Sequence, residues 1–100
     1  GISWYAATAG AGFMKRSGHG AVVYNNKMWV IGGSTNTSMQ MADVWSSENG
    51  VSWNNVLPLG VFPPREHFGC VVFRNTIWVI GGQALGTAFT NDVWTAVQGK

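Results

Sequence analysis

Few side chains in this chain of 100 residues could carry chemistry, and their spacing fits no catalytic group. The candidates are His19, His67, Asp43, Glu48, Glu66, Asp92, Cys70, Tyr5 and Tyr24. Glycan hydrolysis by a tyrosine nucleophile also needs an arginine cluster and an acidic pair, and the sequence groups no such set. The double glycines follow apolar strands and open no helix, so we predict no phosphate-binding loop. We therefore expect a protein that is not an enzyme, with no catalytic residue and no cofactor.

The two histidines do not form a repeated metal-binding pattern. His19 aligns with Phe68 and His67 with Gly18 when the two halves of the chain are superimposed. We interpret both histidines as hydrogen-bonded residues at strand entries, and we expect no metal. Cys70 is the only cysteine and lies in an apolar run, which is typical of a small buried side chain.

The charge balance excludes some classes of partner. The chain has 6 basic and 4 acidic residues, a net charge of +2, and Lys15-Arg16 is its only adjacent basic pair, so nucleic-acid binding is not predicted. No apolar stretch approaches the ~18 residues of a membrane span, so no membrane is expected. Charged residues make up 10% of the chain, against about 25% in ordinary domains. This low fraction predicts that part of the surface is covered by another chain or by a larger protein.

The elements that must position these residues come from an internal repeat. The phrase Gly20–Gly33 returns as Gly69–Gly82, an offset of 49 residues with no gap. The same offset relates Arg16 to Arg65, Asn26 to Asn75, Asp43 to Asp92, Trp45 to Trp94 and Trp4 to Trp53. A fixed period of this length indicates a repeat architecture.

Each unit is predicted to form short strands, because apolar runs rich in Val, Ile and Trp are bounded by Gly or Asn. The expected strands are Gly20–Tyr24, Met28–Gly33, Asp43–Ser47, Val51–Val56, Gly69–Phe73, Ile77–Gly82 and Asp92–Val97, with a lone copy of the fourth strand at Ile2–Ala6. Hairpin turns are expected at Asn25–Lys27 and Arg74–Thr76, since Asn tolerates positive φ. The double glycines are expected to end the second strands. Asp43 and Asp92 are expected to accept hydrogen bonds from loop N–H groups.

This pattern resembles the kelch repeat. The resemblance rests on Arg16 and Arg65 before the first strand, on Trp-Val-Ile-Gly-Gly, on Asp-Val-Trp and on a following lone Trp, and it covers essentially the whole chain. A kelch repeat is one four-stranded antiparallel blade of a β-propeller. The resemblance implies an all-β chain, 1–100, holding two blades: 7–56, and 57–100 completed by strand 1–6 of a neighbouring copy. The run Ser46–Trp53 also resembles the Asp-box of sialidase-type propellers, with Glu48 in place of Asp, and we interpret it as a turn.

Two blades do not close a ring, because propellers typically have four to eight. Gly1 and Gly99 fall at the same phase of the repeat. We therefore expect copies to join head to tail, with Ile2–Ala6 of one chain pairing beside Val97 of the next. Three copies are favoured and four come next. The alternative is that the sequence is a fragment of a longer kelch protein.

The kelch resemblance also implies a binding site at one mouth of the central channel. The residues that it places there are Arg16, Ser17, His19, Ser34, Thr35, Arg65, Glu66, His67, Gln83 and Ala84. Arg16 and Arg65 either bind acidic groups of a partner or clamp each blade to its loop, and both interpretations fit their recurrence. The predicted function is a non-catalytic scaffold or binding module for proteins or peptides. The alternative is a lectin-like or glycan-active propeller. Kelch-like copper oxidase chemistry is not expected, since Tyr24 and Cys70 occupy packing positions.

Overall fold

The structure is a computed structural model that describes residues 1–36, 39–56, 62–84 and 88–97. Its elements are β1 (Gly20–Tyr24), β2 (Lys27–Ser34), β3 (Gln40–Ser47), β4 (Asn54–Asn55), β5 (Arg65–Glu66), β6 (Gly69–Val72), β7 (Thr76–Ala84) and β8 (Ala88–Val97). All pairings are antiparallel, which confirms the predicted all-β fold. Among the described residues no helix is long and apolar enough to cross a membrane.

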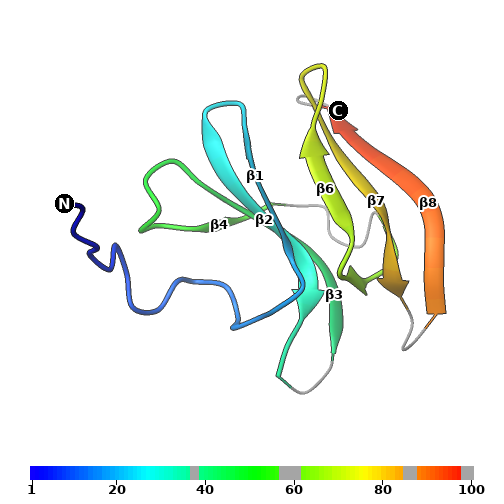
Figure 1. The fold of residues 1–100 in the computed structure, drawn as a ribbon, viewed down its shortest axis with the longest axis horizontal. Coiled ribbons are helices and arrows are strands. Elements are labelled where there is room, and N and C mark those ends of the chain that lie inside the picture. The colour runs from blue at the N-terminus through cyan, green and yellow to red at the C-terminus, as the bar shows by residue number, and fades with distance from the viewer. Residues whose placement is uncertain (37–38, 57–61, 85–87, 98–100) are drawn as a thin grey trace.

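The strands form two consecutive antiparallel units, which lie side by side (Figure 1). Blade 1 consists of β1–β4, paired in chain order. Blade 2 consists of β6–β8, and the short strand β5 joins the blades because it pairs with β3 and with β7. The repeat in the sequence therefore appears as a repeat in space.

The inner hairpins turn as the sequence predicts. Asn25 and Asn26 have φ angles of 52° and 60°, and Arg74 and Asn75 have 53° and 59°. Two successive residues with positive φ fit a tight hairpin, because that turn matches the twist of the strands. Trp29 donates its indole N–H to the Tyr24 carbonyl across the first hairpin, at 2.7 Å.

The double glycines do not end their strands, contrary to the prediction. The register of β2 against β3 shifts between Ile31 and Gly33, and β2 continues to Ser34. Gly32 and Gly33 have φ angles of 58° and 101°. A Cβ on Gly33 would lie 2.8 Å from the Cβ of His19. The pair therefore forms a bulge that lets the incoming chain approach β2 closely.

Two predicted strands differ from the structure. The expected strand Val51–Val56 shrinks to β4, because the Asn49 side chain accepts the N–H groups of Val51 and Ser52 at 2.9 Å and forms a turn. Residues 1–6 form no strand in the single chain, and Trp4 is 89% exposed. Pairing of this segment with another copy stays a prediction.

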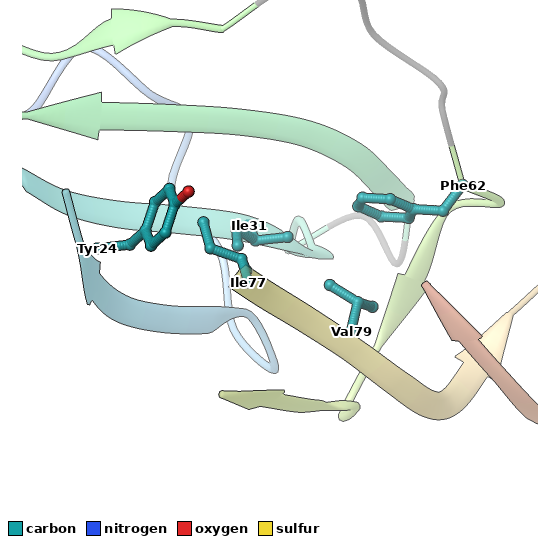
Figure 2. Packing of buried hydrophobic residues seen from close by; sticks show 5 residues of the cluster. All are labelled: Tyr24, Ile31, Phe62, Ile77 and Val79. Atoms are coloured by element: carbon teal, nitrogen blue, oxygen red, sulfur yellow. The ribbon is translucent and has the colours of Figure 1, made fainter. Parts of the chain in front are cut away.

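The hydrophobic core lies between the two blades. Its buried members are Tyr24, Ile31, Phe62, Ile77 and Val79, and Figure 2 shows side chains of blade 1 meeting those of β7. Strands β1 and β6 also lie side by side, so a Cβ on Gly20 would lie 2.7 Å from the Cβ of Cys70. This packing fixes one end of blade 1 against the matching end of blade 2.

Candidate functional site

The predicted site lies where the chain enters β1 and β6, and an ion pair anchors the entry to blade 1. Arg16 donates to both carboxylate oxygens of Asp43, at 2.6 and 2.9 Å, and to the carbonyl oxygen of Gly32 at 2.9 Å. Trp45 donates its indole N–H to the same carboxylate at 2.8 Å. The positive φ of Gly32 belongs to the bulge, so the bulge and the ion pair form one unit.

Blade 2 repeats this arrangement with the equivalent residues. Arg65 donates to the two oxygens of Asp92 at 2.7 and 2.8 Å and to the Gly81 carbonyl at 2.8 Å. Trp94 donates to Asp92 at 2.7 Å. The Arg65 side chain is 0% exposed. We call these two groups the Arg–Asp–Trp clamps.

The clamps keep both aspartates ionised. Burial opposes ionisation of Asp43, but the hydrogen bonds from Arg16 and Trp45, together with the Arg16 charge, lower its pKa. Hydrogen bonds from Arg65 and Trp94 hold the pKa of Asp92 well below its usual range. Each clamp is thus a paired unit with no net charge.

The clamps bear on the two interpretations of the arginines. The Arg16 side chain is 1% exposed, and the guanidinium groups of both arginines are bonded to aspartate and backbone oxygens. This geometry favours the structural clamp over a fork that binds a partner. Asp43 and Asp92 lie inside β3 and β8, and among the described residues their carboxylates accept hydrogen bonds from Arg and Trp side chains, with the backbone N–H of Asp43 adding to its own carboxylate.

A second polar group, the Glu66 cluster, joins both blades at the same end. The Glu66 carboxylate accepts a hydrogen bond from the Ser34 hydroxyl at 2.6 Å and one from Gln40 Nε2 at 3.3 Å. Gln40 also donates to the Gln83 carbonyl at 3.1 Å. His67 Nδ1 lies 3.6 Å from a Glu66 oxygen. The cluster thus combines residues of β2, β3, β5 and β7.

Backbone pairing positions the cluster. Ser17 and Ser34 exchange two N–H···O bonds of 2.9 Å, and Glu66 pairs with Gln83 in the equivalent place of blade 2. The His67 N–H donates to the Gly18 carbonyl at 2.7 Å, with a positive φ of 53° at His67. This bond holds the entry to β6 against the entry to β1.

The remaining predicted residues lie at this end with different exposure. Thr35 and Ala84 are buried, whereas His67 is exposed. Burial and then the nearby Arg16 charge lower the pKa of His19, so this histidine is neutral near pH 7. The hydrogen bond from Ser34 lowers the pKa of Glu66, burial opposes this, and Gln40 and His67 reinforce it.

The sequence did not identify Gln40 as a site residue, and it did not predict that each arginine pairs with an aspartate. Gln40 follows a loop of unlike sequence in the two units, so nothing in the repeat distinguishes it. The clamps did carry a signal, because each arginine and its aspartate are 27 residues apart in both units. Residues 37–38, between β2 and β3, and residues 85–87, between β7 and β8, lie outside the described residues.

The polar side chains of this site mainly form hydrogen bonds, and one of them, Glu66, is a carboxylate outside the clamps. Within the described ranges, no three His, Cys, Asp or Glu side chains are grouped so that they could hold a metal ion. Burial raises the pKa of the Cys70 thiol to about 11, so this group is protonated at neutral pH. The Glu66 cluster offers hydrogen-bonding groups and the negative charge of one carboxylate.

Comparison with known proteins agrees with this fold. A family model described as DUF6242 beta propeller domain matches residues 3–99. The chain belongs to this family. No curated protein matches it significantly. As part of a β-propeller domain, the two blades place the entries of β1 and β6 beside each other, and a propeller suggests a binding or scaffold module.

Proposed function

We propose that this β-propeller domain is a non-catalytic binding scaffold of the kelch type, and that the Glu66 cluster binds a protein or peptide segment carrying a basic side chain. The observation that carries the proposal is the cross-blade bonding of Glu66, which holds a carboxylate at the end of the blades. Loops and strand entries on a rigid scaffold are where recognition commonly lies.

The clamps indicate which charge the partner should carry. Arg16 and Arg65 are each neutralised by an aspartate, so they do not give this end a positive potential. Glu66 has a lowered pKa and is ionised at neutral pH, and its neighbour His67 adds positive charge only when protonated. A basic partner therefore fits better than the acidic partner that exposed arginines would favour.

The Glu66 cluster is preorganised for such a partner. Glu66 is fixed by Ser34 and Gln40, so little side-chain entropy is lost when a ligand binds. A carboxylate has about four lone-pair sites, so it can accept a further hydrogen bond beyond these two. His67 is exposed beside it and offers a polar edge.

Selection from a phage-displayed library of random linear peptides tests the proposal. We expect the selected peptides to be enriched in Lys and Arg, and we expect Glu66→Gln to weaken their binding at least tenfold. The matched control is Glu48→Gln, which removes an exposed acid in the turn of blade 1 and should leave binding unchanged. Recovery of no binding peptide, or of peptides that bind Glu66→Gln as tightly as the original chain, contradicts the proposal.

A further inference from the structure

The contact between the blades joins two different faces. On blade 1 the residues directed to the core are Val22, Trp29 and Ile31, and on blade 2 they are Cys70, Ile77 and Val79. Alternation along each strand sends the intervening side chains to the opposite face. The interface is therefore heterologous, with a front face on blade 2 and a back face on blade 1.

The repeat places a second front face on the outer side of blade 1. The residues equivalent to Cys70, Val72, Ile77 and Val79 are Ala21, Val23, Met28 and Val30. They line an apolar groove of about 340 Å³, to which Trp53 also contributes. Val23 is 69% exposed and Met28 is 40% exposed, whereas Ile77, the equivalent of Met28, is 5% exposed.

A second back face lies on the outer side of blade 2. Val71, Trp78 and Ile80 are the equivalents of Val22, Trp29 and Ile31. Ile80 is 42% exposed, whereas Ile31 is 2% exposed in the core. Figure 1 shows β8 of blade 2 at one margin of the molecule and the N-terminal segment beside blade 1 at the other.

Gly69 supplies an independent observation. Its equivalent, Gly20, must lack a side chain, because a Cβ there would lie 2.7 Å from the Cβ of Cys70 in the next blade. A Cβ on Gly69 would meet only Ile80, at an ordinary 3.6 Å, and its φ is not positive. The single chain therefore gives Gly69 no reason to be glycine, whereas a further blade packed on this face would.

We propose that a second copy of this chain docks its outer blade 2 face into the groove on the outer face of blade 1. The joint would repeat the core, with Phe73, Ile80, Phe13, Met28 and Val30 in the places of Tyr24, Ile31, Phe62, Ile77 and Val79. At the joint Gly69 would face Ala21 and His19 of the other copy, the equivalents of Cys70 and Phe68.

A copy of the chain fits this groove because it presents the same back face that already fills the equivalent surface of blade 2. Exposed apolar faces of this kind commonly mark sites of protein association. A heterologous contact repeats until the ring closes, which for two blades per chain gives three or four copies in a ring of six or eight blades. This inference deepens the proposed scaffold, but the Glu66 cluster lies within one chain, so peptide binding does not depend on the joint.

Sedimentation velocity and light scattering of the 100-residue chain at micromolar concentration test the joint. We expect a mass of three or four times 10.8 kDa for the original chain and 10.8 kDa for Val23→Asp, Ile80→Asp and Gly69→Ala. Val23 and Ile80 are partly exposed in the single chain, so these variants should fold, which circular dichroism checks. The control Val51→Asp replaces an exposed apolar residue in the turn before β4 and should keep the original mass.

A mixing experiment tests the head-to-tail geometry. Val23→Asp keeps an intact back face and Ile80→Asp keeps an intact front face, so an equimolar mixture should form a one-to-one dimer. A single-chain mass for the original protein, a mixture that stays monomeric, or a Val23→Asp variant that still forms the full assembly would each overturn the proposal. Peptide binding by Ile80→Asp then reports separately on the Glu66 cluster.

Discussion

Asp43→Asn tests the clamp of blade 1 with the smallest change of shape. The Asp43 carboxylate accepts hydrogen bonds from Nη1 and Nη2 of the Arg16 guanidinium group and from the indole N–H of Trp45. Asparagine keeps one acceptor oxygen and loses the negative charge. The Arg16 cation, 1% exposed, would then be buried without a counter-charge.

The structure indicates how much free energy of unfolding Asp43→Asn should remove. Removing one partner of a buried ion pair costs about 3–5 kcal/mol. The Asp43 side chain is 20% exposed, so water replaces part of the lost bonding, and Arg16 keeps its bonds to the Met14 and Gly32 carbonyls. We expect a loss of about 2–3 kcal/mol in the free energy of unfolding, at or below the lower end of that range. With a urea m-value of about 2 kcal/mol/M, the unfolding midpoint should fall by about 1–1.5 M.

The pH dependence follows from the direction of the pKa shift. The pKa of Asp43 is lower in the folded chain than in the unfolded chain, where it is about 3.9. Its stabilisation is therefore complete above the unfolded pKa and is lost as the pH falls through the folded pKa. The original chain should therefore exceed Asp43→Asn in free energy of unfolding by the full amount at pH 7 and by a smaller amount at pH 3.

Urea unfolding followed by tryptophan fluorescence measures both effects. The Ile80→Asp background is used for both chains, so that association of copies does not add to the stability. Glu48→Gln is the control, because it removes an exposed acid from the same blade. A loss within 0.5 kcal/mol at pH 7, which is typical of surface substitutions, would refute the clamp, as would an equal loss at pH 3 and pH 7.

Two further predictions concern the bulge and the cysteine. Gly82→Ala should lower the thermal midpoint strongly, because φ is 103° and a Cβ would lie 2.7 Å from the Cβ of Phe68; Gly10→Ala, with nothing within 4 Å, should not. Equal midpoints for the two variants would count against the bulge. Because burial raises its pKa to about 11, the Cys70 thiol should react with iodoacetamide at pH 8 about 100-fold more slowly than a free thiol, and urea should restore the rate. Fast alkylation of the folded chain would show that Cys70 is not buried against blade 1.

The inner hairpins could be predicted from sequence because their causes are local. β1 has the bounds expected from its apolar run, and the Asn25-Asn26 turn has the positive φ values that Asn tolerates. β4 could not be predicted in the same way. Its strand propensity is overridden when Asn49 captures two N–H groups of the following residues, a competition that side-chain hydrogen bonds commonly win in turns.

The repeat predicted where the candidate site residues lie along the strands, but it did not predict their hydrogen-bond partners. The repeat locates Ser34, Glu66 and Gln83 at strand entries and exits, and the structure brings them to one end. The bonds made by Gln40 span 26 and 43 residues along the chain, so no local pattern encodes them. A partner-binding role and a structural clamp would both explain why the arginines recur in the two units. Only the burial of the arginines and their bonds to aspartate distinguish these two roles.

β5 links the clamp to the proposed recognition surface. It has two residues, and alternation along a strand sends their side chains to opposite sides. Arg65 points into blade 2 and is fully buried, whereas Glu66 joins the cluster with Ser34. The ion pair between Arg65 and Asp92, which anchors β5 to blade 2, therefore also holds the neighbouring Glu66 carboxylate in position.

The equivalent pair in blade 1 presents a different side chain. There Arg16 is followed by Ser17, so the clamp is kept while the carboxylate is replaced by a hydroxyl. Each chain thus presents one such carboxylate for every two blades. In the proposed head-to-tail assembly, carboxylates would recur at alternate blades around one end, three or four in all. A multivalent basic partner would then bind the assembly more tightly than a single chain, since linked sites raise the effective concentration of each contact.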